Sequence, residues 1–390
     1  MQWRPSTWKK SLNAFFLVIS LAVVFISIRD YRKPRENRKG VLHSEINNYL
    51  IFSNSFEVLA SGGDLYNYHP KEHFDLYKYS PAFAFFMAPF HFMPEWLGLT
   101  VWNLLNFALL FFALKWIPGM DSRRVLIVLL IGVLELLGSI MNEQSNGLMV
   151  GMVVLAFALF ERDRSFWAIA VLMASFYTKL FTGIFIGLVI FYPGFWKNAL
   201  YTFFWFLFFA FIPVLLTGWD QLSFLYQSWA FLLLNDHGMS QGYSLMGILQ
   251  TWFGWEADKL LVVAGGLLLT LLPLVRISLY ESFRYRMEFT ASLLLWVIVF
   301  NHKSESPTFI IAMTGIGLWY VHSARTGFRT ALLVFAMLFV SIAFSDLTPK
   351  YIREAVFYKY SLKALPCLII WMVMVYEMLT ARFANEVIEN

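Results

Sequence analysis

The stretch SLNAFFLVISLAVVFISI, residues 11–28, decides the fold class because it is apolar, contains no charged residue and is long enough to cross a bilayer. Its flanks are basic, with Lys9 and Lys10 before it and Arg29 after it. No small-residue cleavage site follows it. We therefore expect a retained first membrane helix rather than a cleaved signal peptide.

The composition of the whole chain agrees with this interpretation. Of its 390 residues, 59% are hydrophobic and only 14% are charged, whereas soluble domains carry about 25% charged residues. Spanning segments should be helices, because lipid offers no partner for backbone amides. The single cysteine, Cys367, excludes a disulfide framework or a cysteine-based metal site within one chain. The net charge of +5 is modest and gives no indication of nucleic-acid binding.

Further apolar segments of spanning or nearly spanning length follow the first. They are residues 98–116, 125–141, 147–160, 166–178, 181–193, 198–217, 259–275, 288–301, 306–322, 329–345 and 364–381. With the first segment they predict an all-α polytopic membrane protein of about twelve transmembrane helices, the shorter ones tilted, broken or buried among neighbours. Residues 80–96 are apolar but contain three prolines, so we expect a helix in the interface or a re-entrant segment there.

No internal repeat or soluble domain is visible, so residues 1–390 are interpreted as one integral-membrane domain, with residues 28–97 as its first extracytoplasmic loop. The distribution of Lys and Arg places the N- and C-termini in the cytoplasm of a plasma (inner) membrane protein. Two basic loops, 29–39 and 346–363, conflict with this orientation. Either the positive-inside rule fails locally, or these cations bind phosphates of the outer leaflet.

With this orientation, four polar clusters fall on the outer side of the membrane: residues 44–81, 142–146, 235–244 and 301–307. The first is the longest. Glu45 and Asn48 would share a helix face if Ser44 caps a helix, and residues 62–64 (Gly-Gly-Asp) are a stop signal. A carboxylate in such a loop can serve as a general base, and the alternative is an ordinary solvated loop.

Single charged residues between or within apolar segments are the other candidates. Lys179 either extends to the interface or binds a phosphate, and the latter is favoured because it lies at the depth of a lipid phosphate. Glu135, inside an apolar segment, is either a functional carboxylate or a protonated structural group bonded to a neighbouring helix, and we favour the structural interpretation.

The turn at residues 301–307 is the densest polar turn between two apolar segments. Ser306 could cap the next helix, with Pro307 at its first position. His302 and Glu305 could bind a divalent metal, but two ligands in one turn are weak evidence, so we expect contacts with sugar or phosphate instead. Asp236 and His237 form a second pair of this kind, for which a solvated loop is the alternative.

Several short motifs resemble the opening of the polyprenol-phosphate-sugar-dependent glycosyltransferases of family 87, which have the GT-C fold. They are Asn48-Tyr49, Gly63-Asp64-Leu65-Tyr66 and Tyr79-Ser80-Pro81-Ala82-Phe83. Gln144-Ser145-Asn146 is similar to the family's Gln-x-Asn turn, and Lys179 to a lysine that closes an apolar helix. The spacing agrees over roughly the first half of the chain, while the last third matches only in hydropathy.

The resemblance implies a GT-C-like bundle that takes a sugar from a polyprenyl phosphate with inversion, and it implies neither a metal nor another cofactor. A carboxylate would accept the proton of the acceptor hydroxyl, and cations and amides would stabilise the departing phosphate. The implied substrate contacts are Tyr66, Lys78, Tyr79, Gln144, Asn146, Lys179, Asp236, His237, His302, Lys303 and Glu305.

One departure from the family pattern affects the base. The family's catalytic aspartate would fall near Asn48, and an amide cannot act as a general base. The base is therefore expected at another carboxylate, Glu45 first and then Asp75 or Asp64. There are two alternatives. Either the alignment of the motif is shifted by one helical turn, or this branch of the family binds a lipid-linked sugar without transferring it.

The expected function is therefore the transfer of one sugar, mannose or a pentose, from a polyprenyl-phosphate donor to a glycan or lipid acceptor outside the cytoplasm, in contact with membrane lipids and without nucleic acid. A transporter or flippase of lipid-linked sugars is the runner-up, but it should carry polar residues at the midplane and show repeat symmetry. A non-catalytic membrane subunit is the third possibility.

Overall fold

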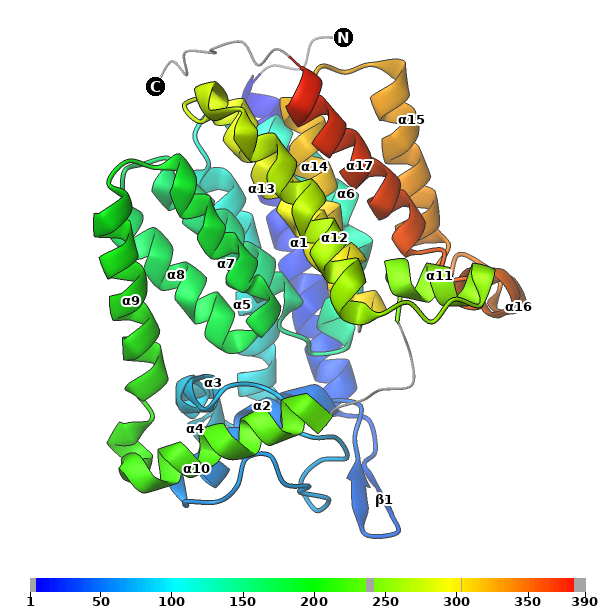
Figure 1. Ribbon diagram of the computed structural model, residues 1–390. Coiled ribbons are helices and arrows are strands. Elements are labelled where there is room, and N and C mark those ends of the chain that lie inside the picture. The colour runs from blue at the N-terminus through cyan, green and yellow to red at the C-terminus, as the bar shows by residue number, and fades with distance from the viewer. Residues whose placement is uncertain (1–4, 236–241, 303, 382–390) are drawn as a thin grey trace.

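The computed structural model describes residues 5–235, 242–302 and 304–381, and it shows a bundle of apolar helices with one end covered by shorter elements (Figure 1). The helices of the bundle are α1 (Pro5–Tyr31), α5 (Glu95–Trp116), α6 (Ser122–Met141), α7 (Asn146–Phe160), α8 (Ser165–Thr178), the 3-10 helix η1 (Leu180–Phe191), α9 (Phe195–Phe211), α12 (Lys259–Leu271), α13 (Phe283–Val299), α14 (Phe309–His322), α15 (Gly327–Ala336) and α17 (Ala364–Thr380).

Every apolar segment predicted to span overlaps one of these helices. Among the described residues, α1, α5 and α6 are each long and apolar enough to cross a bilayer alone, and the others in the bundle are shorter or bent. The helical class and the apolar helices of a membrane protein are therefore confirmed, while the number of spans stays a prediction. The helices pack closely, α5 on α7, α13 on α14 and α14 on α6, around one large apolar core.

The predicted span at residues 198–217 does not form one helix. After α9 the chain turns by 88° at Pro213 into α10 (Val214–Asn235), which lies across the lower end of the bundle in Figure 1. Pro213 favours the break because it lacks an N–H for the helical ladder. Gly218, with φ 72°, breaks α10 again near its start.

The segment between α1 and α5 folds onto the same end as α10. It contains the hairpin β1 (Glu36–Arg38) and β2 (Val41–His43), then α2 (Asn47–Ala60), α3 (Pro81–Phe86) and α4 (Ala88–Phe92). We call this segment together with α10 the cap. A second apolar cluster joins the cap to α5, with Phe52 and Trp229 of the cap and Trp102 of α5 buried in it. Residues 80–96 thus form two short helices and not a span, as their prolines predict.

The two ends of α2 differ in how well they follow the sequence signals. The helix ends as predicted, with Ser61 as C-cap and Gly62 in the left-handed region at φ 75°. Its start is different, because Ile46 occupies the N-cap position and the Ser44 hydroxyl instead accepts a hydrogen bond from the Ile46 N–H at 3.3 Å. The predicted Ser44 cap is therefore wrong, and Glu45 precedes the helix.

The remaining elements lie after α10. They are α11 (Leu245–Phe253), η2 (Leu272–Val275), η3 (Ile277–Leu279), η4 (Ser306–Thr308), the π-helical segments η5 (Met337–Ile342) and η6 (Arg353–Tyr358), and α16 (Lys350–Ile352). The predicted Ser306 cap is also wrong, since Glu305 is the N-cap of η4. The Ser306 hydroxyl instead accepts a hydrogen bond from Lys363 Nζ at 2.6 Å.

Lys363 is also the partner of the Glu135 carboxyl inside α6. Lys363 Nζ lies 2.9 Å from Glu135 Oε2, and the two side chains are only 1% and 6% exposed. Glu135 is thus bonded to a neighbouring helix as expected, but its partner is a cation. The pair joins α6 and the start of α17, and through Ser306 it holds the turn before α14.

Candidate active site

The polar clusters predicted to share one side of the membrane meet at one end of the bundle. Asn48 Nδ2 donates to the Asn142 carbonyl at 2.9 Å, which joins the first cluster to the second. Asn146 Nδ2 donates to the Pro307 carbonyl at 3.0 Å, which joins the second to the last. In the described part of the third cluster, the Tyr243 N–H donates to the Ser304 carbonyl at 2.8 Å. The convergence predicted from hydropathy is therefore confirmed for the described residues.

These clusters enclose a cavity of about 1200 Å³ between the cap and the bundle. We call it the reaction cavity. Of the predicted site residues, it is lined by Glu45, Asn48, Asp75, Lys78, Tyr79, Gln144, Lys179, His302 and Glu305. Asn146 lies directly behind this lining and bonds to Lys179. Asp236, His237 and Lys303 lie outside the described residues.

One wall of the cavity is apolar. It is formed by η1, α12 and α13, which contribute Phe181, Ile184, Val263, Leu267, Val297 and Phe300. The outer face of α12 is itself exposed and apolar, with Leu260 75% and Leu268 66% exposed. A cavity with one polar and one apolar wall fits a molecule that has a charged head and a hydrocarbon tail.

Lys179 stands where the two walls meet, as the C-cap residue of α8. Its Nζ donates to Asn146 Oδ1 at 2.8 Å and to Gln144 Oε1 at 3.4 Å, and it lies 6.0 Å from the ring centre of Tyr79. Burial lowers the pKa of Lys179 to about 8, and the negative charge of Glu305 opposes this shift. Within the described residues its contacts are neutral amides, so its charge is available to an anion.

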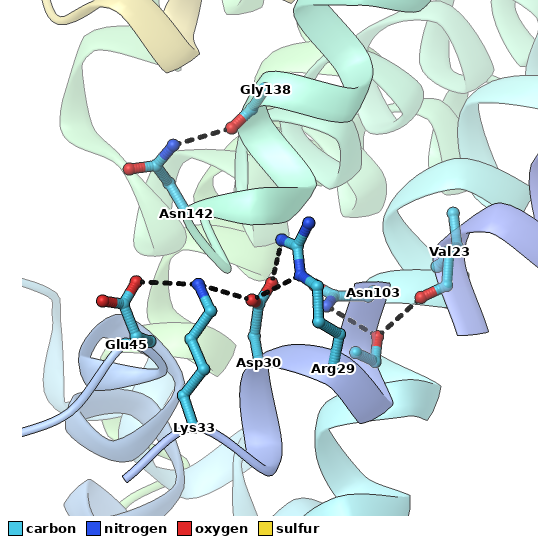
Figure 2. Close-up of polar contacts among 9 residues, drawn as sticks. Val23, Arg29, Asp30, Lys33, Glu45, Asn103, Gly138 and Asn142 are labelled. Carbon is cyan, nitrogen blue, oxygen red and sulfur yellow. Dashed lines mark hydrogen bonds and ion pairs between the residues drawn. The ribbon is translucent and has the colours of Figure 1, made fainter. Parts of the chain in front are cut away.

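Glu45 belongs to a chain of charged side chains at one side of the cavity (Figure 2). Lys33 Nζ lies 3.3 Å from Glu45 Oε2 and 3.0 Å from Asp30 Oδ1, and Arg29 bonds the other oxygen of Asp30 at 2.8 Å. The Glu45 side chain is 60% exposed, whereas that of Asp30 is 4% exposed. Glu45 is therefore the member of this chain that a molecule in the cavity can reach.

Asp75 is another exposed carboxylate of the lining, and its Oδ1 accepts the Leu76 N–H at 2.7 Å. Two other predicted residues lie away from the cavity. Both oxygens of Asp64 accept from the Ser228 hydroxyl at 3.0 Å, which fastens the loop after α2 to α10. Tyr66 is buried in the cap and donates to the Tyr79 carbonyl at 3.0 Å. Both interactions stabilise the cap, and neither residue reaches the reaction cavity.

Asn48 also differs from the expected role. Asn48 lines the cavity, but its amide donates to the Asn142 carbonyl and so binds α2 to the turn between α6 and α7. An aspartate at this position could not donate that bond. The geometry therefore gives Asn48 a positioning role.

The sequence did not single out two carboxyls that the structure brings to this region, Asp30 and Glu143. Asp30 lies within α1, which extends beyond the predicted end at Ile28. Glu143 is 2% exposed, lines the cavity and has a positive φ of 46°. Its position between two amides was the only sequence signal, and backbone handedness cannot be read from it.

Four cations of the first basic loop are paired within the protein. Besides Lys33 and Arg29, Arg35 bonds Glu95 and Arg38 bonds Glu36 at 2.7 Å. In the last loop, Arg353 bonds Asp346 at 2.7 Å. The positive charge of these residues is therefore balanced by carboxylates of the protein itself. This weakens the idea that they serve mainly as sites for lipid phosphate.

Comparison with solved structures finds similarity to ArnT from Cupriavidus metallidurans. The crystal structure bound to undecaprenyl phosphate shares 13% identity, over 94% of this chain and 77% of that one, with a TM-score of 0.44. The apo crystal structure shares 12% identity, over 95% and 77%, with the same TM-score. No curated protein sequence matches the chain.

The family comparison covers most of the reaction cavity. The model of glycosyltransferase family 87 matches residues 77–303, more than half of the chain, and this range contains Tyr79, Gln144, Lys179 and His302. The first expected motif, with Glu45 and Asn48, lies before the matched range. The chain belongs to glycosyltransferase family 87.

Proposed function

We propose that this protein transfers one sugar from a polyprenyl phosphate to the hydroxyl of a glycan or lipid acceptor, in the reaction cavity. Family membership supports glycosyl transfer. The observation that carries the choice of donor is Lys179, a cation held by two amides at the junction of a polar and an apolar wall. A phosphate at Lys179 would let a polyprenyl tail lie along Ile184, Leu267 and Val297.

The reaction needs little assistance at the leaving group. The acceptor oxygen forms a bond to the anomeric carbon while the bond from that carbon to the phosphate oxygen breaks, and polyprenyl phosphate leaves. Negative charge grows on the phosphate, so a donor that is already oriented stabilises the transition state more than the ground state. Lys179 has this property, because Asn146 and Gln144 fix its Nζ.

The proton of the acceptor hydroxyl must pass to a base as the new bond forms. Glu45 is our first candidate and Asp75 the second, since both are exposed carboxylates of the lining. Lys33 keeps Glu45 oriented at the cavity mouth through the ion pair of 3.3 Å. Inversion follows if the base and the phosphate lie on opposite faces of the sugar.

The finer assignments rest on the sequence. We propose mannose or a pentose as the sugar, an extracytoplasmic cavity and cytoplasmic termini. The described start of α1 and the end of α17 lie at the end of the bundle opposite the cap, which is consistent with this topology (Figure 1). The whole chain is proposed to act as one domain, with residues 28–97 outside the membrane.

The test is transfer of a labelled sugar from synthetic polyprenyl phosphates by the purified protein in nanodiscs. Glu45→Gln and Asp75→Asn, measured separately, should abolish transfer in at least one case without loss of folded protein. Asp64→Asn is the matched control, because its carboxylate bonds Ser228 and does not line the cavity. If both cavity variants turn over like the wild type, the base assignment is wrong. If the wild type transfers no sugar from any polyprenyl phosphate, the proposed donor class is wrong.

A further inference from the structure

Glu143 is a buried carboxyl that the mechanism above does not use. It lies in the turn between α6 and α7, which holds two of the amides already described, and its side chain lines the reaction cavity. The backbone on both sides is fixed: the Glu143 N–H donates to Ile140 at 3.0 Å, its carbonyl accepts Trp102 Nε1 at 2.9 Å, and the Gln144 N–H donates to Ser139 at 3.1 Å.

The hydrogen bonds of the Glu143 and Gln144 N–H groups form a Schellman cap, which ends α6 and places Glu143 in the position that is normally left-handed. Its φ of 46° is in the left-handed region, where a residue with a side chain is strained and glycine is not. Burying a carboxyl adds a further cost. A turn selected for stability alone would carry glycine here. The cap explains the backbone but not the choice of glutamate, and a buried carboxyl at the cavity lining, where glycine is the usual residue, indicates a role for the side chain.

Four charged groups face Glu143 across the turn. Arg29, Asp30 and Lys33 come from the end of α1, and Glu45 precedes α2. The two cations are already bonded to Asp30 and Glu45 (Figure 2). An ionised Glu143 would be a third negative charge beside two cations. Burial, together with the negative charges of Asp30 and Glu45, raises the pKa of the Glu143 carboxyl to about 9.

We propose that Glu143 is a neutral carboxylic acid that donates a hydrogen bond to the acceptor sugar, next to the hydroxyl that Glu45 deprotonates. This inference rests on the proposed function. Glu143 is near Glu45, while its neighbour Gln144 bonds Lys179 on the donor side. A neutral acid can donate a hydrogen bond to a neighbouring sugar hydroxyl and so hold the acceptor beside Glu45, whereas a carboxylate could only accept one.

The proposal distinguishes Glu143 from the two other carboxyls of this region. Asp30 is held by two cations and serves to orient Lys33. Glu45 must be ionised in order to accept a proton. Glu143 must keep its proton throughout the reaction, so it neither gains nor loses one when the sugar moves. The acceptor it recognises is therefore a polyhydroxyl compound, a glycan or the sugar head of a glycolipid.

Two variants separate this role from a structural one. Glu143→Gln keeps a neutral donor of the same size, so transfer at pH 7 should stay within about threefold of the wild type. Glu143→Gly relieves the backbone strain and removes the donor, so kcat/KM for the acceptor should fall about 5- to 10-fold, the upper part of the range for a hydrogen bond between neutral groups. The KM for the donor should not change.

The pH dependence of transfer tests whether Glu143 acts in its protonated form. At saturating donor, wild-type transfer should decrease as the pH rises through about 9, because Glu143 then loses its proton, and Glu143→Gln should lack this decrease. Equal activity of Glu143→Gly and wild type would overturn the proposal. So would a loss in Glu143→Gln as severe as in Glu45→Gln, since Glu143 would then act as an ion.

Infrared spectroscopy tests the protonation without any transfer. The difference spectrum between wild type and Glu143→Gln at pH 7 should contain the carbonyl stretch of a protonated carboxylic acid, and this band should disappear above about pH 9. A carboxylate band in its place would refute a neutral Glu143 even if the enzyme transfers sugar. If the acid band is present but the enzyme transfers no sugar, the proposed function fails and the protonation of Glu143 stands.

Discussion

Replacement of Lys179 by methionine tests the donor side of the cavity. The change removes the cation that is bonded to Asn146 at 2.8 Å and keeps most of the side-chain volume. A hydrogen bond to a charged group contributes about 1.5–3 kcal/mol. Because about 1.4 kcal/mol corresponds to a factor of ten, kcat/KM for the polyprenyl-phosphate donor should fall about 10- to 150-fold.

The pH dependence of the same parameter gives an independent check. Lys179 has a pKa of about 8, lowered from its ordinary value by burial, so it is charged below that pH and neutral above it. Wild-type kcat/KM for the donor should therefore fall about tenfold per pH unit above pH 8. In Lys179→Arg this decrease near pH 8 should disappear, because a guanidinium remains charged.

The assay is donor-dependent transfer in nanodiscs, with Lys197→Met as the matched control. Lys197 is a cation in the first turn of α9, at the end of the bundle opposite the cap, and it does not line the cavity. A Lys179→Met enzyme within threefold of the wild type would refute phosphate binding by this residue. A decrease at pH 8 that persists unchanged in Lys179→Arg would refute its titration.

Two further predictions concern the packing that holds the cavity. Glu135→Gln should destabilise the protein by about 3–5 kcal/mol, because Lys363 is left as an unpaired buried charge. The double variant Glu135→Leu/Lys363→Met should recover most of that loss in thermal unfolding. A single variant as stable as the wild type would contradict the importance of the pair. Gly98→Ala should lower the free energy of unfolding by about 1–3 kcal/mol, because the added Cβ would lie 2.0 Å from the Tyr49 hydroxyl. An unchanged melting temperature would show that α2 and α5 move apart without cost.

The fold was predictable from the sequence as far as it depends on hydropathy. Each apolar segment became helical, and the prolines of residues 80–96 divided that segment into α3 and α4. Convergence of the polar turns followed from the alternation of segments alone. The bend at Pro213 was missed because the apolar pattern continues through it from α9 into α10.

The site was predictable only in part, because local sequence does not show which side chains meet. Lys179, Gln144 and Asn146 were predicted through their resemblance to family motifs, and Lys179 also from its depth between two apolar segments. Asp64 belongs to a sequence motif that resembles one of the family, but its carboxylate bonds Ser228 of α10. No feature of the neighbouring sequence indicates that contact. Glu143 was missed because its importance depends on a backbone φ and on its distance from α1.

The location of the lipid phosphate tests the central claim most directly. A structure of the protein with an unreactive polyprenyl-phosphate sugar should show the phosphate within hydrogen-bond distance of Lys179 Nζ. The prenyl chain should lie along the wall formed by Ile184, Leu267 and Val297. A phosphate bound outside this cavity, or a chain that follows another face of the bundle, would contradict the account.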